Sequence, residues 1–321
     1  MAEYRRPAVG TDALAAWCSR WLGAPPAAEL FEAGHLSAVR GLRLADGREV
    51  VVKVRPRSPR LAGCAAVHRA LWAAAFPCPE PLVGLRPLDG YAASAEALVP
   101  DGGRPPPERE LAARSAAALA RLVELAPDPG LVPSLAPSPS WTGWDHPGPE
   151  LWPAPEDLDA DLNACRGPQW LDRTAAAVRE LLRGHARDPV IGHGDWHPDN
   201  LRWQGPRLIA VHDWDSLICQ PEAAIAGLAA ASFRGLGEPG IASAADSAAF
   251  LDAYARARGR RWSPREYAAS WAAGLWQRAF DAKTRSLDGD PEHILTRPQA
   301  RARLRLAGLD PALAAPAPHR G

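Results

Sequence analysis

Residues 190–216 read VIGHGDWHPDNLRWQGPRLIAVHDWDS, and this stretch decides how the rest of the chain is interpreted. It contains two short β-prone runs, 201–203 and 207–211, joined by a Gly-Pro turn. Asp195, Asn200 and Asp213 fall on or beside the ends of these runs. The pattern therefore predicts three polar side chains gathered at the mouth of a pocket.

Phosphoryl transfer needs a polar set of this kind. One carboxylate must accept or orient the proton of the attacking hydroxyl, and Asp195 suits that position. A second carboxylate and a carbonyl-type oxygen must hold Mg²⁺ against the phosphates, which suits Asp213 and Asn200. A cation must also reach the phosphates, and Lys53 follows three valines in a run that is typical of a buried strand. The residues alone favour a kinase that uses ATP and Mg²⁺.

Two motifs in this stretch resemble those of a known family. Residues 193–200, HGDWHPDN, match the HGDxHxxN loop of the aminoglycoside phosphotransferase and choline kinase-like family. Residues 211–215, VHDWD, are similar to its I-D-[WF]-[ED] metal motif. The resemblance covers nearly the whole chain and implies an α+β, two-lobed protein-kinase-like fold. A small β-rich N-terminal lobe would span 1–99, and a larger helical C-terminal lobe 100–321.

The resemblance also implies roles for individual residues. It makes the chain an ATP-dependent O-phosphotransferase acting on a hydroxyl of a small molecule, with GTP as an alternative nucleotide. Asp195 would be the catalytic base, and Asn200 and Asp213 the magnesium ligands. The nucleotide would contact the phosphate lysine, a turn hydroxyl and the backbone of a hinge segment before the linker: Lys53, Ser37, Glu96, Ala97 and Leu98.

The sequence departs from the family pattern in two places. Family kinases usually pair the lysine with a glutamate on the following helix, but residues 59–79 contain no acid, and the matching position falls near Cys64. We therefore expect Lys53 to be held by Asp213 or by phosphate alone. The family often has an aspartate in the helix after the metal motif, and here only Glu222 could replace it.

The expected elements divide the chain into a strand-rich first part and a helical second part. The pair Asp46-Gly47 separates two β-prone runs, 38–44 and 49–55, and predicts a hairpin. Further strands are expected at 82–85 and 91–99, and helices at 11–22, 61–76, 108–125, 172–185, 221–233, 244–258, 264–286 and 298–307. Residues 100–107 form a Pro/Gly-rich connector. Residues 127–155 are irregular and dense in Pro, Ser and Trp.

Other interpretations of the same residues stay open. The alternating His and Asp of 193–199 are compatible with a hydrolase that binds transition metals, although Pro198 interrupts the alternation and Lys53 is then left without a role. A kinase-like module that has lost catalysis is a third possibility. Within the kinase hypothesis His193 is expected to fix the loop by hydrogen bonds. The roles of His197, near the phosphate or structural, and of Asp215, a supporting acid or an occasional metal ligand, are left open.

The acceptor is not specified by the sequence. Trp141, Trp144 and Trp152 are expected either to line its site or to pack the irregular segment. Trp271, Trp276 and Asp281, on one predicted helix, are weaker candidates. The acids Glu150, Glu156, Asp157, Asp159 and Asp161 could attract a cationic acceptor, or could mark a solvated helix start. An antibiotic or related natural product is the leading hypothesis, with a metabolic amino alcohol or sugar derivative as the alternative.

Composition restricts the partners and the compartment. Lys+Arg and Asp+Glu both number 37, and a formal net charge of zero does not suggest binding to nucleic acid or to a membrane surface. No apolar run follows the N-terminal arginines as it would in a signal peptide. The five dispersed cysteines favour reduced thiols in the cytoplasm. We expect a monomer or a small homo-oligomer.

Overall fold

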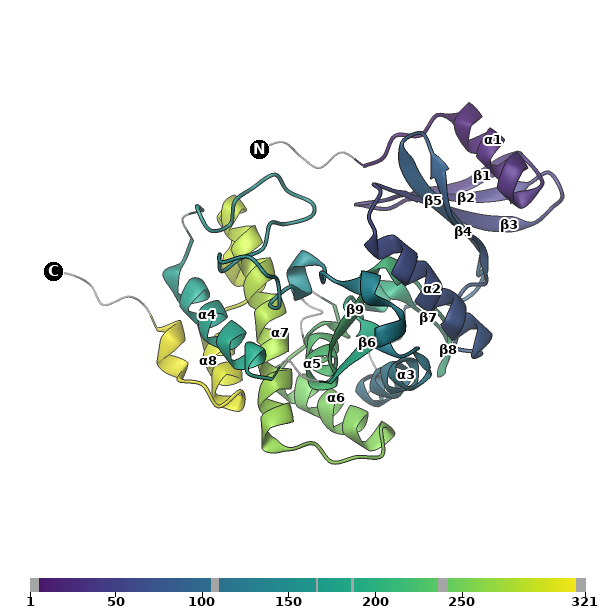
Figure 1. The fold of residues 1–321 in the computed structure, drawn as a ribbon. Helices are drawn as coiled ribbons and strands as arrows, with labels where there is room; N and C mark the ends of the chain where they lie inside the picture. The colour runs from purple at the N-terminus through teal and green to yellow at the C-terminus, as the bar shows by residue number, and fades with distance from the viewer. Residues whose placement is uncertain (1–5, 105–109, 166, 186–187, 236–241, 316–321) are drawn as a thin grey trace.

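The computed structural model describes residues 6–104, 110–165, 167–185, 188–235 and 242–315. Figure 1 shows a smaller lobe built on one twisted sheet and a larger lobe built mainly from helices. This is the kinase-like, two-lobed α+β arrangement that the sequence predicts.

The smaller lobe is organised around a five-stranded antiparallel sheet in the order β1-β2-β3-β5-β4. Its strands are β1 (Pro26–Ala33), β2 (Ala38–Leu44), β3 (Glu49–Arg55), β4 (Pro81–Leu88) and β5 (Tyr91–Ala97). The predicted hairpin is β2–β3, and its turn uses Gly47 at φ 88°, a left-handed conformation that glycine adopts without strain. Strand β1 was not predicted, because it is mostly exposed and lacks the apolar alternation of a half-buried strand.

The register of the central strands determines which side chains meet near the linker. Lys53 on β3 lies opposite Ser94 on β5, and Val51 lies opposite Glu96. Residues two apart on a strand share a face, so Lys53 and Glu96 lie diagonally on the same face of the sheet. Val50, Val52 and Val54 point to the opposite face and form the apolar core of this lobe with helix α1 (Thr11–Leu22).

Helix α2 (Arg60–Ala73) lies between the sheet and the larger lobe (Figure 1). It begins one residue before the predicted start and ends three residues before the predicted end. Its buried side includes Cys64 and His68. The chain then passes through β4 and β5 and leaves the sheet at residue 98. The linker is hydrogen-bonded to the larger lobe through a bridge between Gly103 and Trp203.

The larger lobe contains helices α3 (Leu111–Leu125), α4 (Gln169–Arg183), α5 (Glu222–Ser232), α6 (Ala244–Ala257), α7 (Pro264–Arg285) and α8 (Arg297–Leu306). Two-stranded sheets pair β6 (Pro189–His193) with β9 (Leu217–Pro221) and β7 (Leu201–Gln204) with β8 (Arg207–Val211). The predicted β7–β8 pair and the helices are present, whereas β9 was missed. The expected start of the helix 108–125 lies outside the described residues, and helix α3 is described from Leu111.

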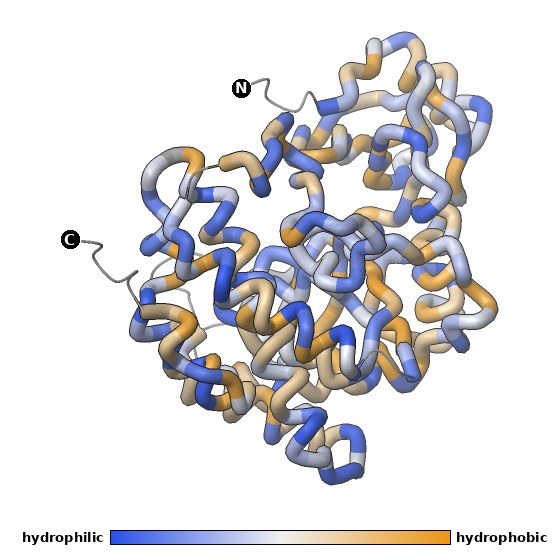
Figure 2. The backbone as a smooth tube through the Cα atoms, turned by 60° about the vertical axis from the view of Figure 1, so that its left-hand side comes forward, coloured by the Kyte–Doolittle hydropathy of each residue, from blue (hydrophilic) through white to orange (hydrophobic). Residues whose placement is uncertain are grey.

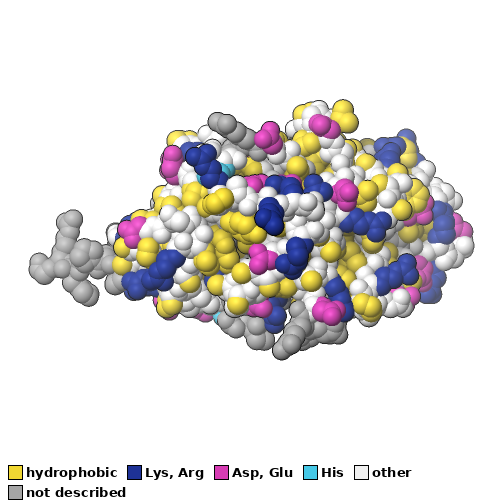
Figure 3. Space-filling model, turned by 90° about the horizontal axis from the view of Figure 1, so that it is seen from below, with side chains coloured by type: hydrophobic (Ala, Val, Ile, Leu, Met, Phe, Trp, Pro, Cys, Tyr) yellow, Lys and Arg dark blue, Asp and Glu magenta, His cyan; other side chains and the backbone are white. Residues whose placement is uncertain are grey.

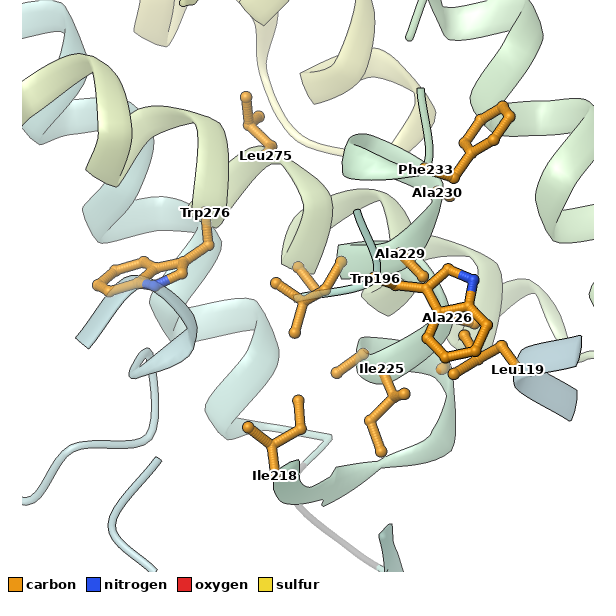
Figure 4. Close-up of a cluster of buried hydrophobic side chains, with 14 of the residues drawn as sticks. Leu119, Trp196, Ile218, Ile225, Ala226, Ala229, Ala230, Phe233, Leu275 and Trp276 are labelled. Atoms are coloured by element: carbon orange, nitrogen blue, oxygen red, sulfur yellow. The ribbon is translucent and has the colours of Figure 1, made fainter. Parts of the chain in front are cut away.

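Helices α5 and α7 pack closely at the centre of this lobe. A Cβ atom at Gly227 would collide with the backbone of Ser270, so only glycine permits the approach. Figure 4 shows the neighbouring apolar cluster, in which Trp196 and Ile225 lie near Leu119 of α3. Because Trp196 belongs to the stretch 193–200, this apolar cluster anchors the loop that carries Asp195 and Asn200.

The surface and the helix exteriors are mixed in character. Figure 2 shows hydrophilic and hydrophobic residues alternating along the helices of the larger lobe, as expected for elements with one buried face. On the face seen in Figure 3, basic and acidic side chains are interspersed, so this face does not carry an extended field of one sign. Across the described part of the chain, every helix is too short or too polar to cross a membrane.

Candidate active site

A cleft of about 990 Å³ lies between the two lobes. That volume is in the range of small-molecule and cofactor sites. The smaller lobe supplies the turn between β1 and β2, the exposed face of β3 and the start of the linker. The larger lobe supplies Asp195, Asn200 and Asp213, so the structure brings together the three residues that the sequence placed at one pocket. Lys53 and Ser37 line the same cleft from the opposite side.

Residues 193–200, here called the HGD loop, are anchored to the larger lobe by two buried side chains. Trp196 is fully buried, and its indole N–H donates to Ser115 Oγ of α3 over 2.8 Å. His193 is also fully buried; its Nε2 lies 3.0 Å from the carbonyl oxygen of His212, and its Nδ1 accepts from the backbone N–H of Asp195. Burial lowers the pKa of His193, which favours the neutral ring that these contacts require.

Asp195 and Asn200 are in direct contact. The side-chain amide of Asn200 donates to Asp195 Oδ2 over 2.7 Å and to the Asp195 carbonyl over 3.0 Å. Burial, reinforced by the negative charge of Asp213, raises the pKa of Asp195. A raised pKa makes a carboxylate a better proton acceptor, which is the property that a general base needs.

Asp213 sits at a strained backbone position after β8. Its φ of 62° is in the left-handed region, which few non-glycine residues adopt, although aspartate does so more readily than most. Ser216 Oγ donates to Asp213 Oδ2 over 2.9 Å, and Arg55 Nη2 donates to Oδ1 over 3.2 Å. Burial alone would raise the pKa of Asp213, but the charges of Arg55 and Lys53 outweigh it and hold the pKa below its usual value. The carboxylate is therefore ionised at neutral pH.

The partner of Lys53 differs from both expected ones. Lys53 Nζ lies 3.4 Å from Glu96 Oε1, so the lysine pairs with a carboxylate on the neighbouring strand β5 instead of with Asp213. Both side chains are largely buried, with exposed fractions of 15% and 8%. The sequence did not indicate this, because the two residues are 43 positions apart and meet only through the β3–β5 register. Cys64, at the helix position without an acid, lines a small adjoining cavity with both of them.

Of the residues expected to bind the nucleotide base, some line the cleft and one does not. Leu98 and Glu96 line the cleft, but Ala97 is not among the residues that line it. The backbone N–H groups of Ala97 and Leu98 donate to the carbonyls of Glu80 and Glu49, so both are already used in the sheet. In the turn between β1 and β2, a Cβ at Gly34 would collide with the carbonyl of Ser37, which explains the glycine there.

The other polar residues of the two motifs, His197, His212 and Asp215, make different contacts. The Nδ1 atom of His197 accepts from the backbone N–H of Asp199, so its ring caps the short helix at 198–200. Asp215 lines the cleft and forms an ion pair with Arg55. His212 Nδ1 lies 3.7 Å from Glu96. In the described part of the chain, no three His, Cys, Asp or Glu residues are grouped to hold a metal ion, which is the arrangement that the hydrolase hypothesis needs.

The tryptophans of the irregular segment have different environments. Trp144 and Trp152 are 1% and 2% exposed and donate to Gln220 and Asp172, so the hypothesis that they line an acceptor site is wrong. Trp152 also packs against Trp276, which is itself fully buried. Trp141 alone among the three lines the cleft. Large aromatics of an irregular segment pack into the core here because that burial stabilises the segment.

The acidic residues suggested for the acceptor side also differ in their positions and contacts. Glu156 lines the cleft, and Asp157 Oδ2 lies 3.3 Å from His35 Nε2 of the facing turn. Helix α4 begins only at Gln169, so the suggested helix start at this acidic segment is wrong. On α7, burial raises the pKa of Asp281 to about 7. The Asp281 Oδ2 atom is buried and has no hydrogen-bond partner among the described residues.

Several residues of the site were not predicted. Arg55 contacts both Asp213 and Asp215, and Arg60 donates to the carbonyl of Asp215 over 2.6 Å. A signal for Arg55 was present, because it lies two positions after Lys53 and must share its face of the strand. Glu222, considered as a substitute acid, instead accepts from Tyr254 and Arg258 and ties α5 to α6.

The fold and these residues define a class. A five-stranded sheet over a helical lobe, with a lysine facing an Asp/Asn/Asp set across an interlobe cleft, is the arrangement of kinase-like phosphotransferases. The sequence model of the phosphotransferase enzyme family matches residues 28–269, most of the chain. The chain belongs to that family. No curated protein sequence matches closely enough to add a relative.

Solved structures agree with the fold. Amicoumacin kinase in complex with AMP-PNP, Ca²⁺ and Ami is 12% identical, with a TM-score of 0.61 over 89% of this chain and 87% of that one. An aminoglycoside phosphotransferase in a ternary complex with ADP and hygromycin B is 15% identical, with a TM-score of 0.60 over 95% and 100%. Spectinomycin phosphotransferase in complex with ADP and spectinomycin is 12% identical, with a TM-score of 0.58 over 93% and 94%.

Proposed function

We propose that this chain transfers the γ-phosphoryl group of ATP to a hydroxyl of a small molecule. The observation that carries the proposal is the assembly of Asp195, Asn200 and Asp213 on one side of the cleft, opposite Lys53. The family and the nucleotides named in the related structures support it. In this proposal residues 1–99 hold the nucleotide, and residues 100–321 carry the catalytic groups and the acceptor site.

The residues have the following proposed roles. Asp195, whose pKa burial raises, accepts the proton of the acceptor hydroxyl as it attacks. Asn200 fixes the orientation of that carboxylate through its 2.7 Å hydrogen bond. Lys53 reaches the phosphates from β3. Because Ala97 and Leu98 use their N–H groups in the sheet, the adenine donor from this segment is the N–H of Val99, which lines the cleft.

A magnesium ion fits the groups that are present. The carboxylate of Asp213 and the side-chain oxygen of Asn200 are hard oxygen donors of the kind that Mg²⁺ takes, with substrate phosphates completing the shell. When bound, the ion would neutralise the charge that develops on the transferred phosphoryl group. Arg55, which contacts Asp213, lies on the phosphate side and adds a second positive charge.

The acceptor side favours a molecule that carries an amine and a ring. Trp141 offers an aromatic surface and Glu156 a carboxyl group in the cleft that Asp195 also lines. Asp281 does not line the cleft, but it is close enough to Asp195 for their charges to interact. An amino-sugar antibiotic or related natural product combines ring surface with positive charge and is the leading acceptor class. A small amino alcohol supplies the charge, which could pack against the Trp141 ring, but offers no ring surface of its own.

A nucleotide-consumption screen tests the proposal. Purified protein with ATP, GTP and Mg²⁺ is offered hydroxylated antibiotics, amino alcohols and sugars, with Asp195→Asn as the background. We expect acceptor-dependent ADP formation that the variant lacks, and a phosphorylated acceptor by mass spectrometry. Saturable ATP binding with no turnover of any acceptor would favour the non-catalytic module instead.

A further inference from the structure

The ion pair between Lys53 and Glu96 lies within a hydrogen-bonded sheet. The two residues belong to the adjacent strands β3 and β5, which pair over six registered positions from Val50 to Arg55. Glu96 is buried, and burial would raise its pKa, but the charge of Lys53 and the nearby His212 ring, whose Nδ1 lies 3.7 Å from Glu96 Oε1, lower it to about 2. Glu96 is therefore a carboxylate over the whole working range of pH.

Helix α2 is anchored by other contacts. It carries no acidic residue that could reach Lys53. Arg60, at its first turn, donates to the backbone carbonyls of Asp215 and Leu217 in the larger lobe. His68 stacks on Trp214 with ring centroids 4.7 Å apart, and its Nε2 lies 2.8 Å from the carbonyl oxygen of Pro79. These side-chain contacts of α2 thus go to the segment around the second motif and to Pro79, and not to the lysine.

We propose that Glu96 is the residue that positions Lys53 for the nucleotide phosphates, so that the lysine is oriented from within the sheet and not by helix α2. The inference rests on the proposed function, because it assigns a task that matters only if Lys53 binds phosphate. Glu96 itself need not touch the nucleotide, and it acts through the lysine. A lysine has four rotatable side-chain bonds, and a fixed counter-charge reduces the conformations that it must lose on binding.

If Glu96 orients Lys53, the position of the lysine is independent of helix α2. Strands β3 and β5 are joined by backbone hydrogen bonds, so the Lys53–Glu96 distance does not depend on where α2 lies. Cys64 of α2 lines the same small cavity, of about 60 Å³, as Lys53 and Glu96. A carboxylate placed at position 64 would therefore extend toward the lysine from the helix side. The position of the acid can be moved experimentally while the lysine is kept.

The experiment compares Glu96→Gln, Glu96→Asp and the double variant Cys64→Glu/Glu96→Gln with wild type and Lys53→Ala. The dissociation constant of a fluorescent ATP analogue with Mg²⁺ is measured together with the KM values for ATP and acceptor. We expect Glu96→Gln to weaken nucleotide binding about tenfold, as the loss of a charge-assisted contact predicts, with the acceptor KM unchanged. Glu96→Asp should recover part of the affinity, and the double variant most of it.

Matched controls separate the possible failures. Glu49→Gln removes an exposed carboxylate, paired with Arg43 on the same sheet, and should leave affinity unchanged. If wild type does not bind ATP saturably, the proposed function fails. If Lys53→Ala weakens binding but folded Glu96→Gln matches wild type, only this inference fails. If Glu96→Gln does not fold, the double variant Cys64→Glu/Glu96→Gln provides the test. A folded double variant that binds the ATP analogue as weakly as Lys53→Ala would also overturn this inference.

Discussion

The side-chain amide of Asn200 donates to the carboxylate of Asp195 over 2.7 Å, and this contact joins the proposed base to a proposed metal ligand. The amide nitrogen faces Asp195, which leaves the amide oxygen for a cation. Trp196 lies between them in sequence; it is fully buried, and its indole N–H donates to Ser115 Oγ, which attaches the loop to the core of the larger lobe. A buried residue of the HGD loop thus anchors the segment that carries two polar residues at the cleft.

Asp195→Asn is expected to reduce turnover by about 10²–10⁴-fold, the usual effect of losing a general base. The amide cannot accept the hydroxyl proton, whereas the nucleotide contacts of Lys53 are untouched. Steady-state rates and the ATP dissociation constant test this together. Asp252→Asn, at an exposed carboxylate on α6, is the matched control. A variant that keeps more than about a tenth of the wild-type turnover would remove the base role from Asp195.

Asp213→Ala is expected to abolish the magnesium dependence of nucleotide binding, because the ion would lose its carboxylate ligand. Mg²⁺ is titrated against a fluorescent ATP analogue for wild type and variant. Asp215→Asn is measured for comparison. Because Asp215 pairs with Arg55, its loss should change the nucleotide affinity less than the loss of Asp213 does. An unchanged magnesium titration in Asp213→Ala would leave that residue with a structural role alone.

The sequence predicted the parts of the site that lie close together in the chain. The HGD loop and the second motif are separated by one hairpin, so local spacing was enough to bring Asp195, Asn200 and Asp213 together. The partner of Lys53 was wrongly predicted, because Glu96 reaches it only through strand pairing between distant segments. Strand register follows from tertiary packing, and a short motif does not encode it.

In the irregular segment 127–155, the sequence likewise did not show which tryptophans are buried. Trp141, Trp144 and Trp152 have similar sequence surroundings, rich in Pro and Gly, and no periodicity distinguishes them. The structure buries two against α4, α7 and β9 and leaves one at the cleft. Without a regular element, the sequence does not give the direction of a side chain, so the acceptor wall could not be assigned from it.

Trp144→Ala and Trp152→Ala are accordingly expected to lower stability by about 3–5 kcal/mol each, through the cavity that each leaves. Trp141→Ala should change stability less and raise the acceptor KM, with the ATP KM unchanged. Chemical unfolding and steady-state kinetics measure the two effects. Trp72→Ala, at a 43% exposed tryptophan on α2, is the control and should stay within about 0.5 kcal/mol of wild type. A selective acceptor effect in folded Trp144→Ala, at wild-type stability, would contradict the burial argument.

Asp281 does not line the cleft, but its charge interacts with that of Asp195, so we expect it to give acceptor binding a dependence on pH. Burial raises its pKa to about 7; Arg278 partly offsets this, and the negative charges of Asp195 and Asp157 add to it. Arg285 also lies near and favours the ionised form. An acid with this pKa is mainly neutral at pH 6 and mainly negative at pH 8. A cationic acceptor should therefore bind more tightly as the pH rises through 7.

The measurement is the acceptor KM at pH 6, 7 and 8, using an acceptor whose amine stays protonated over that range. In wild type we expect the KM to fall by about tenfold from pH 6 to pH 8, the size of one charge-assisted contact. Asp281→Asn should remove most of this dependence, while Asp252→Asn should keep it. Titration of Asp195 changes kcat, so the acceptor KM is the quantity that reports Asp281, and the ATP KM is the internal control. If Asp281→Asn retains the wild-type pH profile of the acceptor KM, the cation that the acceptor carries is bound elsewhere in the cleft, with Glu156 as the next carboxylate to replace.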